Sequence, residues 1–151
     1  MTAENIDFTD KPVRLIMEND IVSDIVYEND VVDSKKKKIL KRLESSMDLR
    51  DFFIVVLDVE TDKIKGIITF KELQDVISEW KKGKNVLFKD AMVSPTTICY
   101  SESIQKVVSL LESSKSVNIV LVTNENNKYL GKIKRTNLDK RLNDFINTFK
   151  S

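Results

Sequence analysis

Residues 54–73 read IVVLDVETDKIKGIITFKEL, and residues 119–138 read IVLVTNENNKYLGKIKRTNL. The two stretches align without gaps at a spacing of 65 residues, and seven of the 20 aligned positions are identical. Ordinary residue usage would give roughly one or two identities by chance. The identical positions include Gly66 and Gly131, and the chain has only three glycines. A fixed internal period indicates a duplicated structural unit.

A second match lies upstream in the same order. The tetrapeptide LESS at 43–46 recurs at 111–114, a spacing of 68 that places three extra residues in the loop 47–53. Two matched segments in the same order favour duplication of a unit of about 65 residues over a coincidence between two hairpins. We expect an N-terminal extension (1–12), a first repeat (13–82), a linker (83–87) and a second repeat (88–151).

The apolar periodicity predicts the same elements in both repeats. In the second repeat, Ile104, Val107 and Leu111 recur at helical spacing, and the apolar run 118–123 is typical of a buried strand. Two segments, ENDIV at 18–22 and ENDVV at 28–32, could each precede the first helix. The predicted strands are 22–27, 53–57 and 64–69, then 96–99, 118–123 and 129–133, and the predicted helices surround 39–43, 73–80, 104–111 and 138–149.

A βαββα unit of this size cannot cover both faces of its sheet alone. We therefore expect an α+β fold in which two βαββα repeats pack sheet to sheet with pseudo-two-fold symmetry. The cleft between two such copies would be the natural ligand site.

Composition narrows the function classes. The 151 residues include 25 basic and 24 acidic side chains, and this balance argues against a nucleic-acid partner. The chain has no histidine and a single cysteine, Cys99, which excludes a Ser-His-Asp centre and a cysteine metal cluster. No apolar run is long enough to span a membrane, and residues 1–10 do not resemble a secretory signal. We expect a cytoplasmic protein that is not an enzyme and has no resident metal or cofactor.

The segments GIITFKEL (66–73) and GKIKRTNL (131–138) resemble the glycine-centred ending of CBS domains, named after cystathionine β-synthase. VRLIM (13–17) and FKDAMVSPTTICYSESI (88–104) resemble the lead-ins of a tandem pair, often called a Bateman module. The resemblance spans about residues 13–148. It is to proteins that consist of a CBS pair alone. It implies a regulatory module that binds an adenosyl nucleotide between the repeats and forms homodimers. AMP, ADP, ATP, S-adenosylmethionine and cyclic di-AMP are the ligands that it implies.

In the first repeat the resemblance points to Thr69 as a phosphate contact and to Glu72 as a ribose contact. Glu72 stands where aspartate or asparagine is usual and is one methylene longer. The alternative interpretation is a strand-end threonine and a first-turn glutamate that suits the helix dipole.

In the second repeat Asn137 matches the ribose position, whereas Lys134 replaces the usual hydroxyl. Lys134 and Arg135 could pair with phosphates, or they could be a solvated basic strand end. Asn137 could instead be a helix-capping amide, and Thr97, on the strand that would line the nucleoside, could simply pack. Because the two motifs differ, we expect at most one good nucleotide site per chain.

These departures leave a second hypothesis open, a degenerate CBS pair that acts as a dimerisation or protein-interaction scaffold without a ligand. Either function could involve a regulated protein partner. The run of four lysines at 35–38 favours a solvated helix surface, and its alternative is a docking patch for an acidic partner or nucleic acid. No aromatic residue is interleaved with the lysines, which disfavours nucleic acid.

Overall fold

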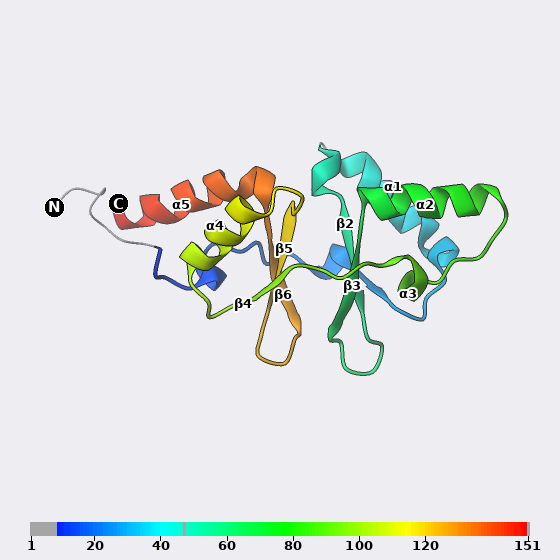
Figure 1. The fold of residues 1–151 in the computed structure, drawn as a ribbon, viewed down its shortest axis with the longest axis horizontal. Coiled ribbons are helices and arrows are strands. Elements are labelled where there is room, and N and C mark those ends of the chain that lie inside the picture. The colour runs from blue at the N-terminus through cyan, green and yellow to red at the C-terminus, as the bar shows by residue number, and fades with distance from the viewer. Residues whose placement is uncertain (1–8, 47, 151) are drawn as a thin grey trace. The chain divides into compact units, whose positions relative to one another are not determined.

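The computed structural model of the chain describes residues 9–46 and 48–150 (Figure 1). Two βαββα repeats follow one another, so the predicted α+β architecture is confirmed. The elements are β1 (Ile25–Tyr27), α1 (Lys36–Ser45), β2 (Phe53–Leu57), β3 (Ile64–Thr69), α2 (Phe70–Lys81), α3 (Phe88–Ala91), β4 (Thr97–Cys99), α4 (Ile104–Ser113), β5 (Ile119–Thr123), β6 (Tyr129–Lys134) and α5 (Leu138–Lys150).

The repeats form two three-stranded sheets of the same topology. In the sheet β1-β2-β3 the outer strand β1 is parallel to β2, and β2 is antiparallel to β3. The sheet β4-β5-β6 repeats this arrangement, including a register irregularity at the same place, after Val56 in β2 and after Val122 in β5. The predicted packing of one sheet against the other stays a prediction.

The compact units of the fold do not begin where the sequence repeats begin. One unit is Val22–Pro95, and the other joins residues 9–21 to residues 96–150. We call residues 12–21 the first lead-in and residues 86–95 the second lead-in. Each lead-in belongs to one sequence repeat by its motif but packs with the sheet of the other repeat. The predicted boundaries at 13 and 88 refer to the duplicated sequence and stay predictions. The compact units divide the chain after Ile21 and after Pro95, so each unit contains the lead-in of the other repeat.

A close backbone contact fixes each lead-in to its sheet. Glu18 and Lys132 exchange two backbone hydrogen bonds, with N···O distances of 2.9 and 3.0 Å. Ile67 and Val93 exchange the equivalent pair at 2.9 Å each. A β-carbon built on Gly131 would lie 2.7 Å from the carbonyl oxygen of Glu18. This approach requires a glycine in β6, as the glycine-centred motif of the sequence indicates.

Within each unit the helices pack on one face of the sheet (Figure 1). In the unit Val22–Pro95 the core includes Ile54, Val56 and Ile68 from the strands and Leu73 and Val76 from α2. In the other unit, Val13 and Ile16 of the first lead-in are buried with Val107 and Leu111 of α4 and with Val120 of β5. The first lead-in is therefore a part of that core.

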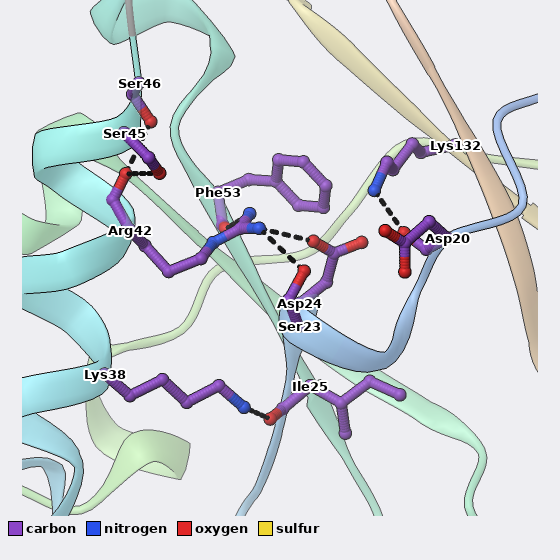
Figure 2. A network of polar contacts seen from close by, with 10 residues as sticks. All are labelled: Asp20, Ser23, Asp24, Ile25, Lys38, Arg42, Ser45, Ser46, Phe53 and Lys132. Carbon is purple, nitrogen blue, oxygen red and sulfur yellow. Dashed lines mark hydrogen bonds and ion pairs between the residues drawn. The ribbon is translucent and has the colours of Figure 1, made fainter.

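The unit Val22–Pro95 also contains a buried ion pair (Figure 2). The side chain of Asp24 is fully buried, and its Oδ1 lies 2.9 Å from Nη1 of Arg42. Nη2 of Arg42 donates to the backbone oxygen of Phe53 at 3.0 Å, and the guanidinium lies 5.4 Å from the Phe53 ring centroid. A charge removed from water in this way needs a partner of opposite sign. At the spacing of 68, Leu110 occupies the position of Arg42 in the second repeat, so this pair is not duplicated.

The first strand is shorter than predicted. β1 begins at Ile25, because Val22–Asp24 forms a 3-10 turn that leaves Val22 exposed and buries Asp24. Of the two candidate segments before the first helix, ENDVV at 28–32 leads into α1 through the 3-10 turn Val32–Lys35. ENDIV at 18–22 ends the first lead-in instead.

We expect Gly131→Ala to lower the free energy of unfolding by about 1–3 kcal/mol, because the new methyl group would push the backbone of Glu18 away from β6. Urea denaturation of the variant and of the wild type measures the difference. Lys115→Ala, at an exposed position of the same unit, is the control and should change stability by less than about 0.5 kcal/mol. An unchanged midpoint for Gly131→Ala would contradict the close approach.

We expect Arg42→Met to destabilise the protein by about 3–5 kcal/mol, since it removes the cation beside a fully buried carboxylate. Lys41→Met removes an exposed positive charge from the adjacent position and should have little effect. Equal unfolding midpoints for the two variants would show that the ion pair does not contribute to the stability of the protein.

Candidate functional site

The candidate residues lie at two equivalent places, where the last strand of each repeat ends and a helix begins. The first junction is Thr69–Glu72, between β3 and α2. The second junction is Lys134–Asn137, where β6 passes through the 3-10 turn Arg135–Asn137 into α5. At the spacing of 65, Thr69 corresponds to Lys134 and Glu72 corresponds to Asn137.

At the first junction the structure brings the two predicted residues together. The hydroxyl of Thr69 donates to Oε2 of Glu72 at 2.7 Å, and both side chains are half-buried. Glu72 also lines a hollow of about 160 Å³ with Asp75, Glu79 and Asp90. Glu79 is paired with Lys82 and Lys84 at 3.5 and 3.2 Å, and the other three carboxyl groups of the hollow disfavour an anion there. The phosphate role of Thr69 and the ribose role of Glu72 stay predictions.

At the second junction Arg135 has a structural role. Its Nε donates to the backbone oxygen of Val117 at 2.9 Å, and its Nη2 donates to those of Leu111 and Ser114 at 2.8 and 2.7 Å. These carbonyls lie at the end of α4 and just after it, where a helix leaves oxygens unsatisfied. Arg135 thereby connects the start of α5 to the end of α4. Its phosphate role stays a prediction, and a phosphate would compete with these backbone oxygens for the guanidinium.

Lys134 differs from its neighbour Arg135. Its side chain is half-buried, and its ammonium group makes no hydrogen bond or ion pair within the part of the chain that the structure describes. Lys134 is the residue directly before the 3-10 turn that precedes α5. A cation of this kind is available for an anionic ligand.

Asn137 faces the first lead-in. Its Nδ2 donates to Oε1 of Glu18 at 2.9 Å. The other carboxylate oxygen of Glu18, Oε2, is buried and has no hydrogen-bond partner among residues 9–46 and 48–150. Thr97 is exposed on β4, and β5 separates β4 from β6 in the sheet. The structure therefore joins Lys134 and Asn137 on one turn, and the predicted role of Thr97 stays a prediction.

Sequence reasoning missed the polar contacts that hold the first lead-in. Arg141 of α5 donates from Nε to the backbone oxygen of Ile16 at 2.9 Å and from Nη2 to that of Met17 at 2.7 Å. Lys132 is 8% exposed, and its Nζ donates to the backbone oxygen of Asp20 at 2.5 Å (Figure 2). Together with Asn137, these residues tie the lead-in to β6 and to the start of α5.

A signal for these residues lies in the comparison of the repeats. Lys132 corresponds to Ile67 and Arg141 corresponds to Val76 at the spacing of 65. Glu18 corresponds to Val93, because each residue follows the methionine of its lead-in and pairs with the same strand position. Three apolar residues of one unit are thus polar in the other, and all three of these polar residues lie where the lead-in contacts its unit.

The lysine run on α1 is partly exposed. Lys36 and Lys37 are exposed, and Lys36 lies 5.6 Å from the centroid of the Trp80 ring. Nζ of Lys38 donates to the backbone oxygen of Ile25 at 2.6 Å (Figure 2). Burial lowers the pKa of Lys38, and the nearby charges of Lys35 and Arg42 act in the same direction. The docking role of this run stays a prediction.

Two further properties concern ligands and membranes. Within the described ranges, no group of three or more histidine, cysteine, aspartate or glutamate side chains is arranged to hold a metal ion. Among the same residues, no helix combines the length and the apolar character that crossing a bilayer requires.

We expect Arg135→Ala to lower the free energy of unfolding by about 1.5–3 kcal/mol in the absence of any ligand, because three backbone oxygens would lose a charged donor. Thermal or urea unfolding measures this effect. Lys134→Ala is the matched control, since its ammonium has no described partner, and it should remain within about 0.5 kcal/mol of the wild type. A larger loss of stability in Lys134→Ala than in Arg135→Ala would contradict the structural role of Arg135.

Comparison with known proteins identifies the fold through solved structures. No family model and no curated protein matches the sequence. CBSX2 in complex with AMP is 17% identical, with a TM-score of 0.69 over 89% of this chain and 97% of that chain. The ATP complex of the CBS domain of the bacterial CNNM/CorC family Mg2+ transporter is 16% identical, with a TM-score of 0.67 over 89% of each chain.

A third similar structure is the CBS domain of a Clostridium difficile 630 protein. It is 18% identical, with a TM-score of 0.64 over 92% of this chain and 98% of that chain. In each of these comparisons the similarity extends over 89% or more of both chains. The chain therefore has the fold of a tandem CBS-domain pair.

Proposed function

We propose that this protein is a regulatory module that binds an adenosyl nucleotide at the second junction, at one site per chain. AMP, ADP, ATP, S-adenosylmethionine and cyclic di-AMP are the candidate ligands. The observation that carries the proposal is the second junction, where Lys134 and Asn137 flank the turn that begins α5 and the Lys134 ammonium has no partner among the described residues. Two proteins of the same fold are known in complex with AMP and with ATP.

Electrostatics favours the second junction over the first. A phosphate near Lys134 would gain a cation and would lie at the positive end of the α5 helix dipole. The first junction instead offers Glu72 beside the carboxyl groups of Asp75 and Asp90, which would repel the same phosphate. This difference supports a single site per chain.

Regulation requires that ligand binding changes another equilibrium of the protein. We expect a homodimer or a complex with a regulated protein whose stability depends on the nucleotide. By linkage, that partner would change the affinity for the nucleotide by the same factor. The role is non-catalytic.

A second candidate function is a dimerisation or protein-interaction scaffold without a ligand. It is favoured by the internal contacts of the candidate residues. Thr69 bonds to Glu72, Asn137 bonds to Glu18, and Arg135 bonds to the end of α4. Groups already satisfied within the protein gain less from a ligand. This function predicts a tight dimer that nucleotides do not affect.

We expect one of the five adenosyl ligands to raise the unfolding temperature and GTP to leave it unchanged. A ligand at 100 times its Kd adds about 2.7 kcal/mol to the free energy of unfolding. For a domain of this size, that corresponds to a rise of about 5–10 °C. Thermal denaturation at fixed protein concentration measures the effect.

Lys134→Ala should weaken binding of the phosphate-bearing ligand about tenfold, because the phosphate would lose its cation. Lys140→Ala removes an exposed charge from α5 and is the matched control. If none of the five ligands shifts the unfolding temperature and the protein is a dimer in sedimentation experiments, the scaffold function replaces this proposal.

A further inference from the structure

Glu18 presents a buried acceptor beside the residue that we propose for the ribose contact. Its Oε1 accepts from Nδ2 of Asn137 at 2.9 Å, and its Oε2 is buried without a donor within the described residues. A buried carboxylate oxygen without a hydrogen bond is costly, so such an atom indicates a missing donor. Whatever completes this contact should bring an O–H or N–H group to Oε2.

The orientation of Asn137 determines what the pair can bind. Its amide has one donor group and one acceptor oxygen, and the donor is directed at Glu18. What remains for a ligand is the second N–H of Nδ2 and two acceptor oxygens, Oδ1 of Asn137 and Oε2 of Glu18. Two neighbouring acceptors match two neighbouring donors, and the two adjacent hydroxyl groups of a ribose are such donors.

The backbone at Glu18 and at its neighbours Met17 and Asp20 is held by hydrogen bonds. The backbone of Glu18 pairs with Lys132 of β6, and the preceding residue, Met17, accepts from Arg141. Two residues further on, Asp20 accepts from Nζ of Lys132 (Figure 2). These contacts hold the carboxylate next to Asn137 before any ligand arrives. Preorganised groups lose little entropy on binding.

We infer that Glu18 of the first lead-in, with Asn137, forms the acceptor pair that binds the vicinal hydroxyls of the ligand's ribose. This inference rests on the proposed function and adds a residue from outside the junction motif. It also adds selectivity, because a deoxyribose, or a cyclic di-AMP ribose with its 3′ oxygen esterified, has only one donor for the two acceptors. The unit Val22–Pro95 has Val93 at the equivalent position and cannot form such a pair.

The test compares AMP with 2′-deoxy-AMP and 3′-deoxy-AMP by isothermal titration calorimetry. The wild type should bind AMP about tenfold more tightly than at least one deoxy analogue, because a hydrogen bond to a carboxylate would be lost. Glu18→Gln keeps the size of the side chain and its bond from Asn137, but it can place an N–H group where Oε2 was. This variant should bind AMP about tenfold more weakly and lose the preference over that analogue.

Asp144→Asn removes a negative charge from an exposed position of α5 in the same unit and is the control. It should bind all three nucleotides as the wild type does. Glu18→Ala, checked for an unchanged unfolding temperature, should show the same loss of selectivity as Glu18→Gln. If either Glu18 variant binds AMP as tightly as the wild type or more tightly, the inference is wrong.

A Glu18 variant that weakens AMP and both deoxy analogues equally would also overturn the inference, since it would show a structural role alone. Absence of AMP binding by the wild type would overturn it as well. The proposed function itself falls only if all five adenosyl ligands fail to bind. The two failures are therefore distinguishable.

Discussion

The approach of the first lead-in to β6 determines where the candidate site can form. Glu18 pairs with Lys132 through two backbone hydrogen bonds, and Gly131 provides the space for its carbonyl oxygen. This contact joins a segment near the start of the chain to a strand more than 100 residues later. Because the backbone is fixed there, the side chain of Glu18 reaches Asn137 at the start of α5. A lead-in held less closely could not support a directional contact of this kind.

Both units hold their lead-ins by a pair of backbone hydrogen bonds, but the side chains around this contact differ between the units. In the unit Val22–Pro95, Met92 packs on Gly66, and the positions Ile67, Val76 and Val93 are all apolar. In the other unit the equivalent positions are Lys132, Arg141 and Glu18. Apolar contacts are non-directional and tolerate small shifts. Hydrogen bonds to backbone oxygens specify one position, because a buried cation that loses its acceptor is strongly disfavoured.

This difference shows what duplication permits. Two copies of one fold need not both keep a binding function, so one copy can change toward stability. The unit Val22–Pro95 has a buried ion pair between Asp24 and Arg42, and its junction is acidic. The other unit has an unpaired ammonium, an amide and a carboxylate oxygen without a donor among the described residues. Unsatisfied buried groups lower stability, and the unit Val22–Pro95 also has two of them among the described residues, Nε of Arg42 and Nε1 of Trp80. The unsatisfied oxygen of Glu18 differs from these two because its carboxylate lies beside Asn137, a residue of the proposed ligand site.

Much of the fold could be predicted from the sequence, because the periodicity of apolar residues is a local signal. The strands around Gly66 and Gly131 and the helices that follow them lie where the repeat and the spacing predict them. The start of β1 was predicted wrongly because the apolar run 22–27 does not reveal the 3-10 turn at Val22–Asp24. That turn is stabilised by a tertiary contact, the one between Asp24 and Arg42.

The exchange of lead-ins and the role of Arg135 could not be predicted in the same way. Asn137 and Glu18 are 119 residues apart, and nothing in the sequence around either residue indicates the other. In the sequence, Arg135 and Lys134 are two adjacent basic residues with nothing to distinguish their roles. In the structure, the guanidinium of Arg135 donates to carbonyls 18 to 24 residues earlier. Such pairings depend on how the helices pack, and composition and motif spacing do not encode this.

Because Glu18 lies on the first lead-in, ligand binding at the proposed site would affect the docking of this segment. The first lead-in ends at Ile21 and continues directly into Val22, the first residue of the other unit. A ligand that bonds to Glu18 would stabilise the docked state of this segment against its undocked state, since only the docked state places the Glu18 carboxylate beside Asn137. The binding free energy would then favour the docked state of the first lead-in. A partner that binds only one of the two states of this segment would be coupled to the nucleotide without contacting it.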